Sequence, residues 1–288
     1  MQSLAHFRNY DLAAGGAALA ACVFLASCSS DNAGGGASEH AADHREQPTI
    51  VSLNPCLDAI LVEVAAPDQI LALSHYSRDP ASSSIPAETA QNFAITGGTA
   101  EEVFALQPDI VLASTFIAPS TLTALEGLGL KVETFGSPAS IEDSIVQVER
   151  VGALTGGGDN AAALVARIND ATSRPTGGGD VSLMLWQPGQ IVPGEGTLIA
   201  QVLSRNGFDS HSANLGLSQA DYVSLERVLA DPPEVLLVAG NSAGQTHPLL
   251  DQLIGTAVET FDPHLLYCGG PTIIEAAARI AEIRKSIR

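Results

Sequence analysis

Short apolar runs alternate with amphipathic segments through most of the chain. The runs at 50–53, 70–74 and 110–113 are brief and continuous, as in strands that are buried on both faces of a sheet. After the first of these runs, Asn54 and Pro55 supply an N-cap and a first-turn proline for a helix that extends to about Val64. Strands that alternate with helices predict a parallel sheet covered by helices.

The alternation is interrupted once and then resumes. Apolar residues recur at helical spacing over 140–174, where three glycines at 156–158 predict a break or bend. A proline and three further glycines at 175–179 end this stretch. Elsewhere we expect strands at 131–135, 181–186, 235–239 and 257–261, and helices at 100–106, 119–128, 197–206, 224–230, 247–253 and 271–287.

Two parts of the chain repeat each other. Residues 101–112 read EEVFALQPDIVL and residues 226–237 read ERVLADPPEVLL. The tetrapeptide VETF occurs at 132–135 and again at 258–261, at nearly the same offset. The alternative is chance, because a helix, a proline and an apolar strand recur in many α/β proteins. We interpret the matches as two lobes of one design.

The repeat predicts an α/β fold with two Rossmann-like lobes. We expect parallel sheets in an N-terminal lobe at 48–155 and a C-terminal lobe at 179–288, joined by a connecting helix at 156–178. Roughly 110 residues allow each lobe its own core. A ligand cleft is expected between the lobes, since clefts between domains commonly hold small molecules.

The N-terminus has the features of an export signal. An apolar segment follows Arg8 and is too short to span a bilayer. It ends in Leu25-Ala26-Ser27-Cys28, which resembles the lipobox of bacterial lipoproteins, although an ordinary secretory signal is the alternative. We expect a signal peptide at 1–27, a lipid on Cys28, a disordered tether at 28–47, and a periplasmic protein anchored to a bacterial membrane.

Charge and cysteine content narrow the function further. A net charge of −19 with two lysines argues against nucleic acid as a partner. Exported proteins meet oxidising conditions, so Cys56 and Cys268 need an explanation. They could form a disulfide, bind a soft metal together with His75, or be two unrelated thiols.

Several segments together resemble one protein family. They are IVSLNPCLDAIL at 50–61, SHYSRDP at 74–80, EEVFALQPDIVLA at 101–113, SLERVLADPPEVLLV at 224–238 and YCGGPTIIEAAARI at 267–280. In this order they resemble the substrate-binding proteins of bacterial ABC importers for cobalamin, ferric siderophores and heme. A subgroup with a cysteine in the first helix turn and a C-terminal Cys-Gly-Gly-Pro is most similar.

The resemblance implies a lipid-anchored receptor that delivers a corrinoid, ferric siderophore or related metal chelate to a permease dimer in the inner membrane. A glutamate on each lobe of these proteins pairs with permease arginines, and the motifs place them at Glu101 and Glu226. Glu102 could serve instead, and both could simply be carboxylates favoured at helix N-termini. We expect a monomer without enzymatic activity or a resident cofactor.

Candidate ligand contacts come from the loops beyond the carboxyl ends of the strands. Trp186 could stack on a flat ligand, Tyr76 aligns with a cleft tyrosine of cobalamin binders, and Arg78 could grip a carboxylate or pair with Asp79. The predicted ligand-binding residues are Cys56, His75, Tyr76, Arg78, Gly97, Gly98, Phe116, Trp186, Gln187, Tyr222, Asn241, Tyr267 and Cys268.

Two other functions remain open at this point. Cys56 and Cys268 could make the protein a metal-ion receptor, although clustered histidines are few. Cys56 and His75 could act as nucleophile and base of a thiol-dependent hydrolase. The other histidines of the folded part show no ligand spacing and are expected on the surface: His211, His247 and His264.

Overall fold

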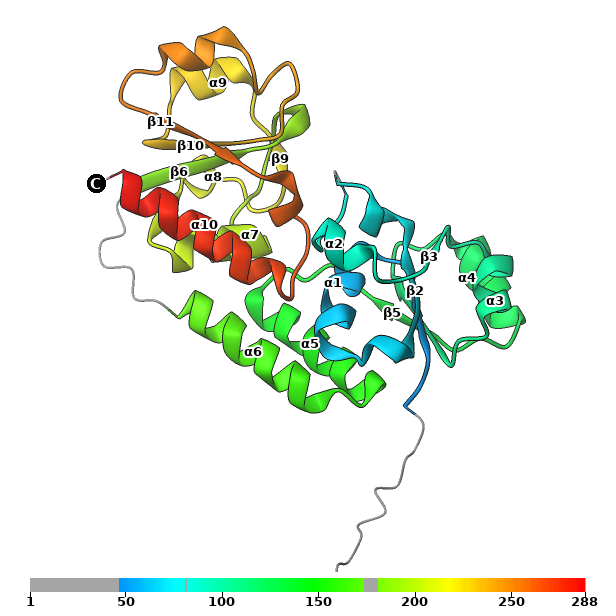
Figure 1. Cartoon of the computed structure of the whole chain (residues 1–288). Coiled ribbons are helices and arrows are strands. Elements are labelled where there is room, and N and C mark those ends of the chain that lie inside the picture. The colour runs from blue at the N-terminus through cyan, green and yellow to red at the C-terminus, as the bar shows by residue number, and fades with distance from the viewer. Residues whose placement is uncertain (1–46, 81, 174–180, 288) are drawn as a thin grey trace, which may run out of the picture. The chain divides into compact units, whose positions relative to one another are not determined.

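The computed structural model describes residues 47–80, 82–173 and 181–287 (Figure 1). The predicted signal peptide, Cys28 and nearly all of the predicted tether lie outside these residues. Within the described ranges, no helix combines the length and the apolar character that a membrane span requires.

The first lobe is built on a parallel sheet with the strand order β3-β2-β1-β4-β5. The short apolar runs of the sequence form its central strands, which are buried on both faces. The strands are β1 (Ile50–Ser52), β2 (Ile70–Ser74), β3 (Ile95–Thr96), β4 (Ile110–Ser114) and β5 (Val132–Phe135).

Helices begin where the sequence predicts caps. The Asn54 side chain accepts hydrogen bonds from the backbone N–H groups of Cys56 and Leu57, and Pro55 opens the first helix. Thr99 caps another helix in the same way. The lobe contains α1 (Pro55–Val64), α2 (Ala87–Ala90), α3 (Ala100–Leu106) and α4 (Pro119–Gly127), with 3-10 turns η1 (Pro67–Gln69) and η2 (His75–Arg78).

The second lobe has its own parallel sheet with the order β11-β10-β6-β8, beside an antiparallel pair of short strands, β7 and β9. The segment at 248–252 is a 3-10 turn and not the predicted helix, because its backbone N–H groups bond three residues back, from Leu250 to His247 and from Leu253 to Leu250. The strands are β6 (Val181–Trp186), β7 (Ile191–Val192), β8 (Phe208–Ser210), β9 (Asp221–Tyr222), β10 (Val235–Ala239) and β11 (Ala257–Phe261). The helical elements are η3 (Pro188–Gln190), α7 (Leu198–Arg205), α8 (His211–Asn214), α9 (Leu225–Ala230), η4 (Pro248–Gln252), η5 (Pro263–Leu265) and α10 (Thr272–Ser286).

The two sheets repeat one topology, as the sequence repeat predicts. The order β2-β1-β4-β5 in the first lobe corresponds to β8-β6-β10-β11 in the second. The strand register is also repeated, since Val111 is paired with Val132 and Leu236 is paired with Val258. The prediction of two separate α/β lobes with parallel sheets is therefore confirmed.

A pair of helices joins the lobes, where the sequence suggested a single connecting helix at 156–178. They are α5 (Ile141–Thr155) and α6 (Gly158–Thr172), and the turn between them uses Gly156 at a positive φ of 75°. Both helices pack on α1, and α6 also packs on α10 of the second lobe (Figure 1). The last residues of the predicted connector, 174–178, lie outside the described part.

One apolar core extends through this junction. It runs from Ile60 of α1 through Val148 and Ile168 of the helix pair to Ile280 of α10 and Leu237 of the second sheet. All five side chains are buried. The lobes are therefore joined by a packed apolar interface, which removes apolar surface from water on both sides.

Candidate ligand-binding site

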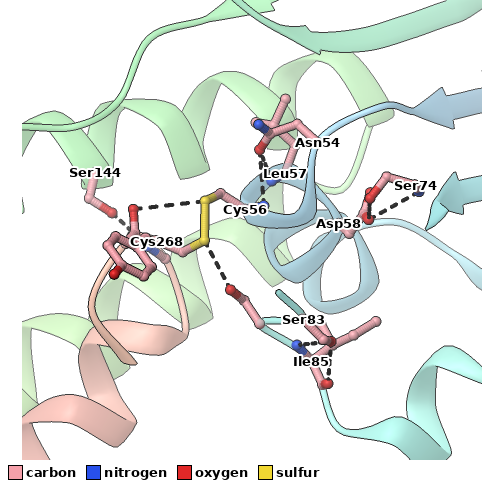
Figure 2. Close-up of a disulfide and its surroundings, with 12 residues drawn as sticks. Asn54, Cys56, Leu57, Asp58, Ser74, Ser83, Ile85, Ser144 and Cys268 are labelled. Atoms are coloured by element: carbon pink, nitrogen blue, oxygen red, sulfur yellow. Dashed lines mark hydrogen bonds between the residues drawn. A yellow bond between two sulfur atoms is a disulfide. The ribbon is translucent and has the colours of Figure 1, made fainter. Parts of the chain in front are cut away.

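A disulfide between Cys56 and Cys268 links the two lobes (Figure 2). Cys56 lies in the first turn of α1, and Cys268 lies in the loop before α10. The hydroxyl of Ser84 is 2.9 Å from the sulfur of Cys268. The sequence left three explanations open for these cysteines, and in the structure they form a disulfide.

The disulfide corrects two other interpretations. A metal site on Cys56 and Cys268 is wrong for this state, because each sulfur is bonded to the other and neither is a thiolate. Across the described residues, no cluster of three or more metal-ligating side chains is present. The thiol-hydrolase hypothesis fails for the same reason, because Cys56 has no thiolate to act as nucleophile.

The Cys-Gly-Gly-Pro loop at 268–271 packs directly against α1 and α5. A Cβ atom at Gly269 would lie 2.4 Å from the hydroxyl oxygen of Ser144, and one at Gly270 would lie 2.6 Å from Cγ1 of Ile60. The backbone N–H of Gly270 donates a hydrogen bond to the Ser144 hydroxyl over 2.7 Å. Only glycine allows this approach, so both positions are explained by close packing next to the disulfide.

The carboxyl ends of the first-lobe strands surround a hollow of about 440 Å³. It contains five of the predicted ligand-binding residues: His75, Tyr76, Gly97, Gly98 and Phe116. Its lining includes no Asp, Glu, Lys or Arg, so the hollow offers hydrogen bonds and apolar contacts but no fixed charge. The other lining residues are Leu53, Asn54, Pro55, Ser74, Thr96, Ala113, Ser114, Ile117, Thr121 and Ser137.

Aromatic rings are accessible at this hollow. Phe116 is 80% exposed and Tyr76 is 43% exposed, although both are large and largely apolar. The rings of His75 and Tyr76 lie 4.0 Å apart between centroids, so they form one aromatic surface. Exposed aromatic rings beside hydrogen-bonding groups are typical of sites that hold flat organic ligands.

A second hollow, of about 520 Å³, lies at the carboxyl ends of β10 and β11. The predicted residue Asn241 lines it, and so does His264, which we expected merely on the surface. The Nδ1 atom of His264 is 2.7 Å from an Asp262 carboxylate oxygen. Pro80 reaches this hollow from the first lobe. The second hollow therefore adjoins both lobes.

Arg78 lies at a smaller hollow of about 230 Å³, which it lines together with Ser84, His264 and Glu275. Its guanidinium donates a hydrogen bond to the carbonyl of Phe93 over 3.0 Å. Arg78 is therefore at the junction of the lobes and is not in the lining of the two larger hollows.

The prediction that Trp186 stacks on a ligand is wrong for this structure. Its side chain is fully buried, and the indole N–H donates to the carbonyl of Val223 over 2.9 Å. Gln187 is also buried and accepts a hydrogen bond from the hydroxyl of Tyr267. Tyr222 and Tyr267 are exposed, but the lining of the two larger hollows does not include them.

Comparison with known proteins identifies the family. Residues 50–258, more than half of the chain, match the family model for periplasmic binding proteins. The chain belongs to this family. A curated cobalamin-binding protein of Halobacterium salinarum is 28% identical over 130 residues, which cover 43% of this chain and 34% of that protein. The chain thus spans about a third of the curated relative that it matches.

Solved structures share the fold of this periplasmic binding protein. A vitamin B12 binding protein of Vibrio cholerae has a TM-score of 0.64 at 18% identity, covering 84% of this chain and 98% of its own. A heme binding protein of the same organism has a TM-score of 0.67 at 18% identity, with coverages of 82% and 98%. At this identity the likeness establishes the fold alone.

The two glutamates predicted to dock occupy equivalent places in the binding protein. Glu101 lies in the first turn of α3 and Glu226 in the first turn of α9, and both are exposed. A hydrogen bond from its own backbone N–H, followed by one from the capping residue Ser224, holds the pKa of Glu226 below its usual range. Glu102 is engaged elsewhere, because its carboxylate accepts a hydrogen bond from the hydroxyl of Thr96. Glu101 is therefore the better match to Glu226.

Sequence reasoning missed several residues of the two hollows. Ser114 and Ser137 line the first, and Thr260 and His264 line the second. The VETF repeat could have found three of them, because Thr260 lies within the second copy and Ser137 and His264 follow the two copies shortly after each strand ends. His211, expected on the surface, is buried, with its Nε2 atom 3.0 Å from the carbonyl oxygen of Asp231.

Proposed function

We propose that this protein is the lipid-anchored solute-binding component of an ABC importer, and that it holds a corrinoid or related metal chelate between its lobes. The observation that carries the proposal is the pair of hollows at equivalent strand ends of two repeated lobes. Ligands of parallel α/β sheets bind beyond the carboxyl ends of the strands, where these hollows lie.

The lining of the first hollow favours a neutral ligand. Carboxylate-bearing chelates are commonly held by arginine or lysine, and the lining contains neither. A corrinoid presents flat apolar faces and peripheral amides, which match exposed Phe116 and Tyr76 beside the hydroxyl groups of Ser114 and Thr121. The curated relative named for cobalamin binding supports the same choice.

Delivery to a permease is supported by the placement of Glu101 and Glu226. The two carboxylates are exposed at corresponding positions of two repeated lobes, and a permease dimer would present two corresponding basic patches. Such charge pairs orient docking more than they add affinity. An acidic protein with a net charge of −19 suits a basic docking surface.

Anchoring by a lipid on Cys28 in the periplasm completes the proposal. It is supported by the apolar segment, the Leu-Ala-Ser-Cys sequence at 25–28 and the polar stretch that follows. Metabolic labelling with a fatty-acid analogue tests it. Label on the wild type and none on Cys28→Ser is the expected result.

Calorimetric titration of the purified protein with cyanocobalamin, hemin and a ferric hydroxamate tests the choice of ligand. We expect cyanocobalamin to bind, and Tyr76→Ala and Phe116→Ala each to weaken it about tenfold or more. Ile254→Ala is the matched control, because this apolar side chain is 97% exposed and lines neither hollow. Binding of hemin alone would overturn the corrinoid assignment and retain the receptor.

A further inference from the structure

Asp58 carries a fully buried carboxylate two residues after Cys56 in α1. Its Oδ2 atom accepts three hydrogen bonds: from the backbone N–H of Ser74 at 3.1 Å, from the Ser74 hydroxyl at 2.5 Å and from the Ser77 hydroxyl at 2.6 Å. Its Oδ1 atom is buried without a partner. Figure 2 shows Asp58 directed at Ser74, away from the disulfide.

The two serines lie on either side of His75 and Tyr76. Ser74 ends β2 and Ser77 belongs to the 3-10 turn η2, and both are buried, whereas His75 and Tyr76 are exposed and line the first hollow. No side chain caps this turn. The hydrogen bonds to Asp58 therefore tie both ends of the pair to α1.

The environment of Asp58 makes its ionisation sensitive to pH. Burial raises its pKa from 3.8 to about 6, although the nearby hydroxyl groups of Ser52, Ser74 and Ser77 oppose the shift. These serines come from β1, β2 and η2, and none of the groups that act on the pKa of Asp58 carries a charge. Both forms of the carboxyl are therefore populated under mildly acidic conditions.

We propose that Asp58 is a positioning residue for the ligand-binding turn: its protonated carboxyl holds His75 and Tyr76 at the first hollow, and its ionisation loosens them. Burial disfavours the ionised carboxylate, so ionisation favours any opening of the turn that gives Asp58 access to water. The contact between this turn and the ligand rests on the proposed function. The control of the turn's position by Asp58 does not depend on that function.

Hydrogen exchange of the ligand-free protein tests the control of the turn by Asp58. After correction for intrinsic rates, we expect amide protection at 74–77 to rise as the pH is lowered, with a midpoint near 6. Asp58→Asn should show no midpoint. The control Asp109→Asn, which removes an exposed carboxylate of the same lobe, should keep the wild-type midpoint. Identical profiles for wild type and Asp58→Asn would overturn the proposal.

Ser77→Ala keeps the carboxylate and gives a second test. Because the Ser77 hydroxyl lowers the pKa of Asp58, its removal should move the midpoint to higher pH. A midpoint that stays in place or moves down contradicts the mechanism.

A cyanocobalamin titration links this control to binding. Affinity should rise about fivefold or more for the wild type between about pH 7.5 and about pH 5, and stay constant for Asp58→Asn. Equal pH profiles for these two proteins would count against the positioning role. Failure of cyanocobalamin to bind at any pH would count against the proposed ligand only, because the exchange experiments need none.

Discussion

Asp109 accepts hydrogen bonds from the backbone N–H and the hydroxyl of Thr49 at 2.7 and 2.8 Å, and so ties the start of β4 to the start of β1. The second lobe repeats the contact: Glu234 accepts from the backbone N–H of Ser182 and donates its own backbone N–H to the Ser182 hydroxyl. Each lobe thus fixes the register of its central strands with the same pairing of a carboxylate and a hydroxyl residue.

The Thr49 contact predicts a loss of stability in acid. The backbone N–H of Thr49 holds the pKa of Asp109 below its usual range, so this contribution is present at neutral pH and is lost as the pH falls through the folded-state pKa. Since Asp109 is exposed, Asp109→Asn should cost under about 1 kcal/mol at pH 7. Denaturant unfolding of both proteins should show the difference shrinking below about pH 4. A cost that is unchanged in acid would contradict this account.

Asp58 should give the opposite pH dependence. Its folded-state pKa is raised to about 6, so its contribution to folding is fully present below the unfolded pKa of about 3.8 and is lost as the pH rises through 6. Between about pH 4 and 7, the free energy of unfolding of the wild type should fall by about 3 kcal/mol relative to Asp58→Asn. Urea unfolding at several pH values measures this difference. A constant difference would show that burial does not raise the pKa of Asp58.

The disulfide should contribute strongly to stability because it closes a sequence separation of 212 residues. The double variant Cys56→Ser with Cys268→Ser should lose about 2–4 kcal/mol of unfolding free energy. Unfolding of wild type and variant in urea, with and without reductant, checks this. Reductant should destabilise the wild type and leave the variant unchanged. Equal stabilities without reductant would mean that packing alone joins the lobes.

Gly270 should tolerate substitution poorly. Its φ is +62°, and a Cβ there would meet Ile60, so Gly270→Ala should cost about 3 kcal/mol or more. Gly255 has a φ of +86° in open space, so Gly255→Ala should cost only the backbone strain of about 1 kcal/mol. The difference between the two melting temperatures measures the packing of the loop. Equal costs would place Gly270 among ordinary turn glycines.

Trp186 should matter for stability and not for ligand affinity. Trp186→Phe removes the indole donor and leaves the buried carbonyl of Val223 without it, at a cost of about 1–2 kcal/mol. The cyanocobalamin affinity should stay within about twofold of the wild type. A large loss of affinity in a folded variant would restore the stacking role that the sequence suggested.

Charge reversal at Glu101 and Glu226 should separate binding from transport. Glu101→Arg and Glu226→Arg should retain cyanocobalamin binding, because both residues lie outside the lining of the hollows. Uptake in cells should fall for each variant and further for the pair, since like charges would meet at the proposed basic docking surface of the permease. Glu126→Arg, on the exposed surface of α4, is the control. Normal uptake by the double variant would remove both residues from docking.

Much of the fold could be predicted because local pattern and tertiary structure agree. Strands at 181–186 and 235–239 and the helix at 100–106 have the expected bounds, and Asn54 caps α1 as its sequence suggests. The repeated VETF predicted two equivalent strands. The alternation of side chains between the two faces of a strand follows from its sequence, so identical sequences favour the same register. The short strand at 208–210 was missed, since three residues carry no measurable period.

The candidate site was less predictable because it depends on side-chain direction. Trp186 ends a strand as expected, but it faces the core, and its indole donor is satisfied by a backbone carbonyl. Spacing could not decide between a disulfide, a metal site and two separate thiols for Cys56 and Cys268, because the two cysteines meet only when the loop before α10 packs on α1 and α5. His264 was overlooked because Glu275, 3.7 Å from its Nε2 atom, comes near it only in the fold.

The bond between Cys56 and Cys268 closes a covalent ring that contains nearly the whole of both lobes. A single protease cut anywhere from residue 57 to residue 267 therefore leaves one molecule, whose fragments separate only after reduction. A protein nicked in an exposed loop would therefore keep its two halves on the anchor proposed at Cys28.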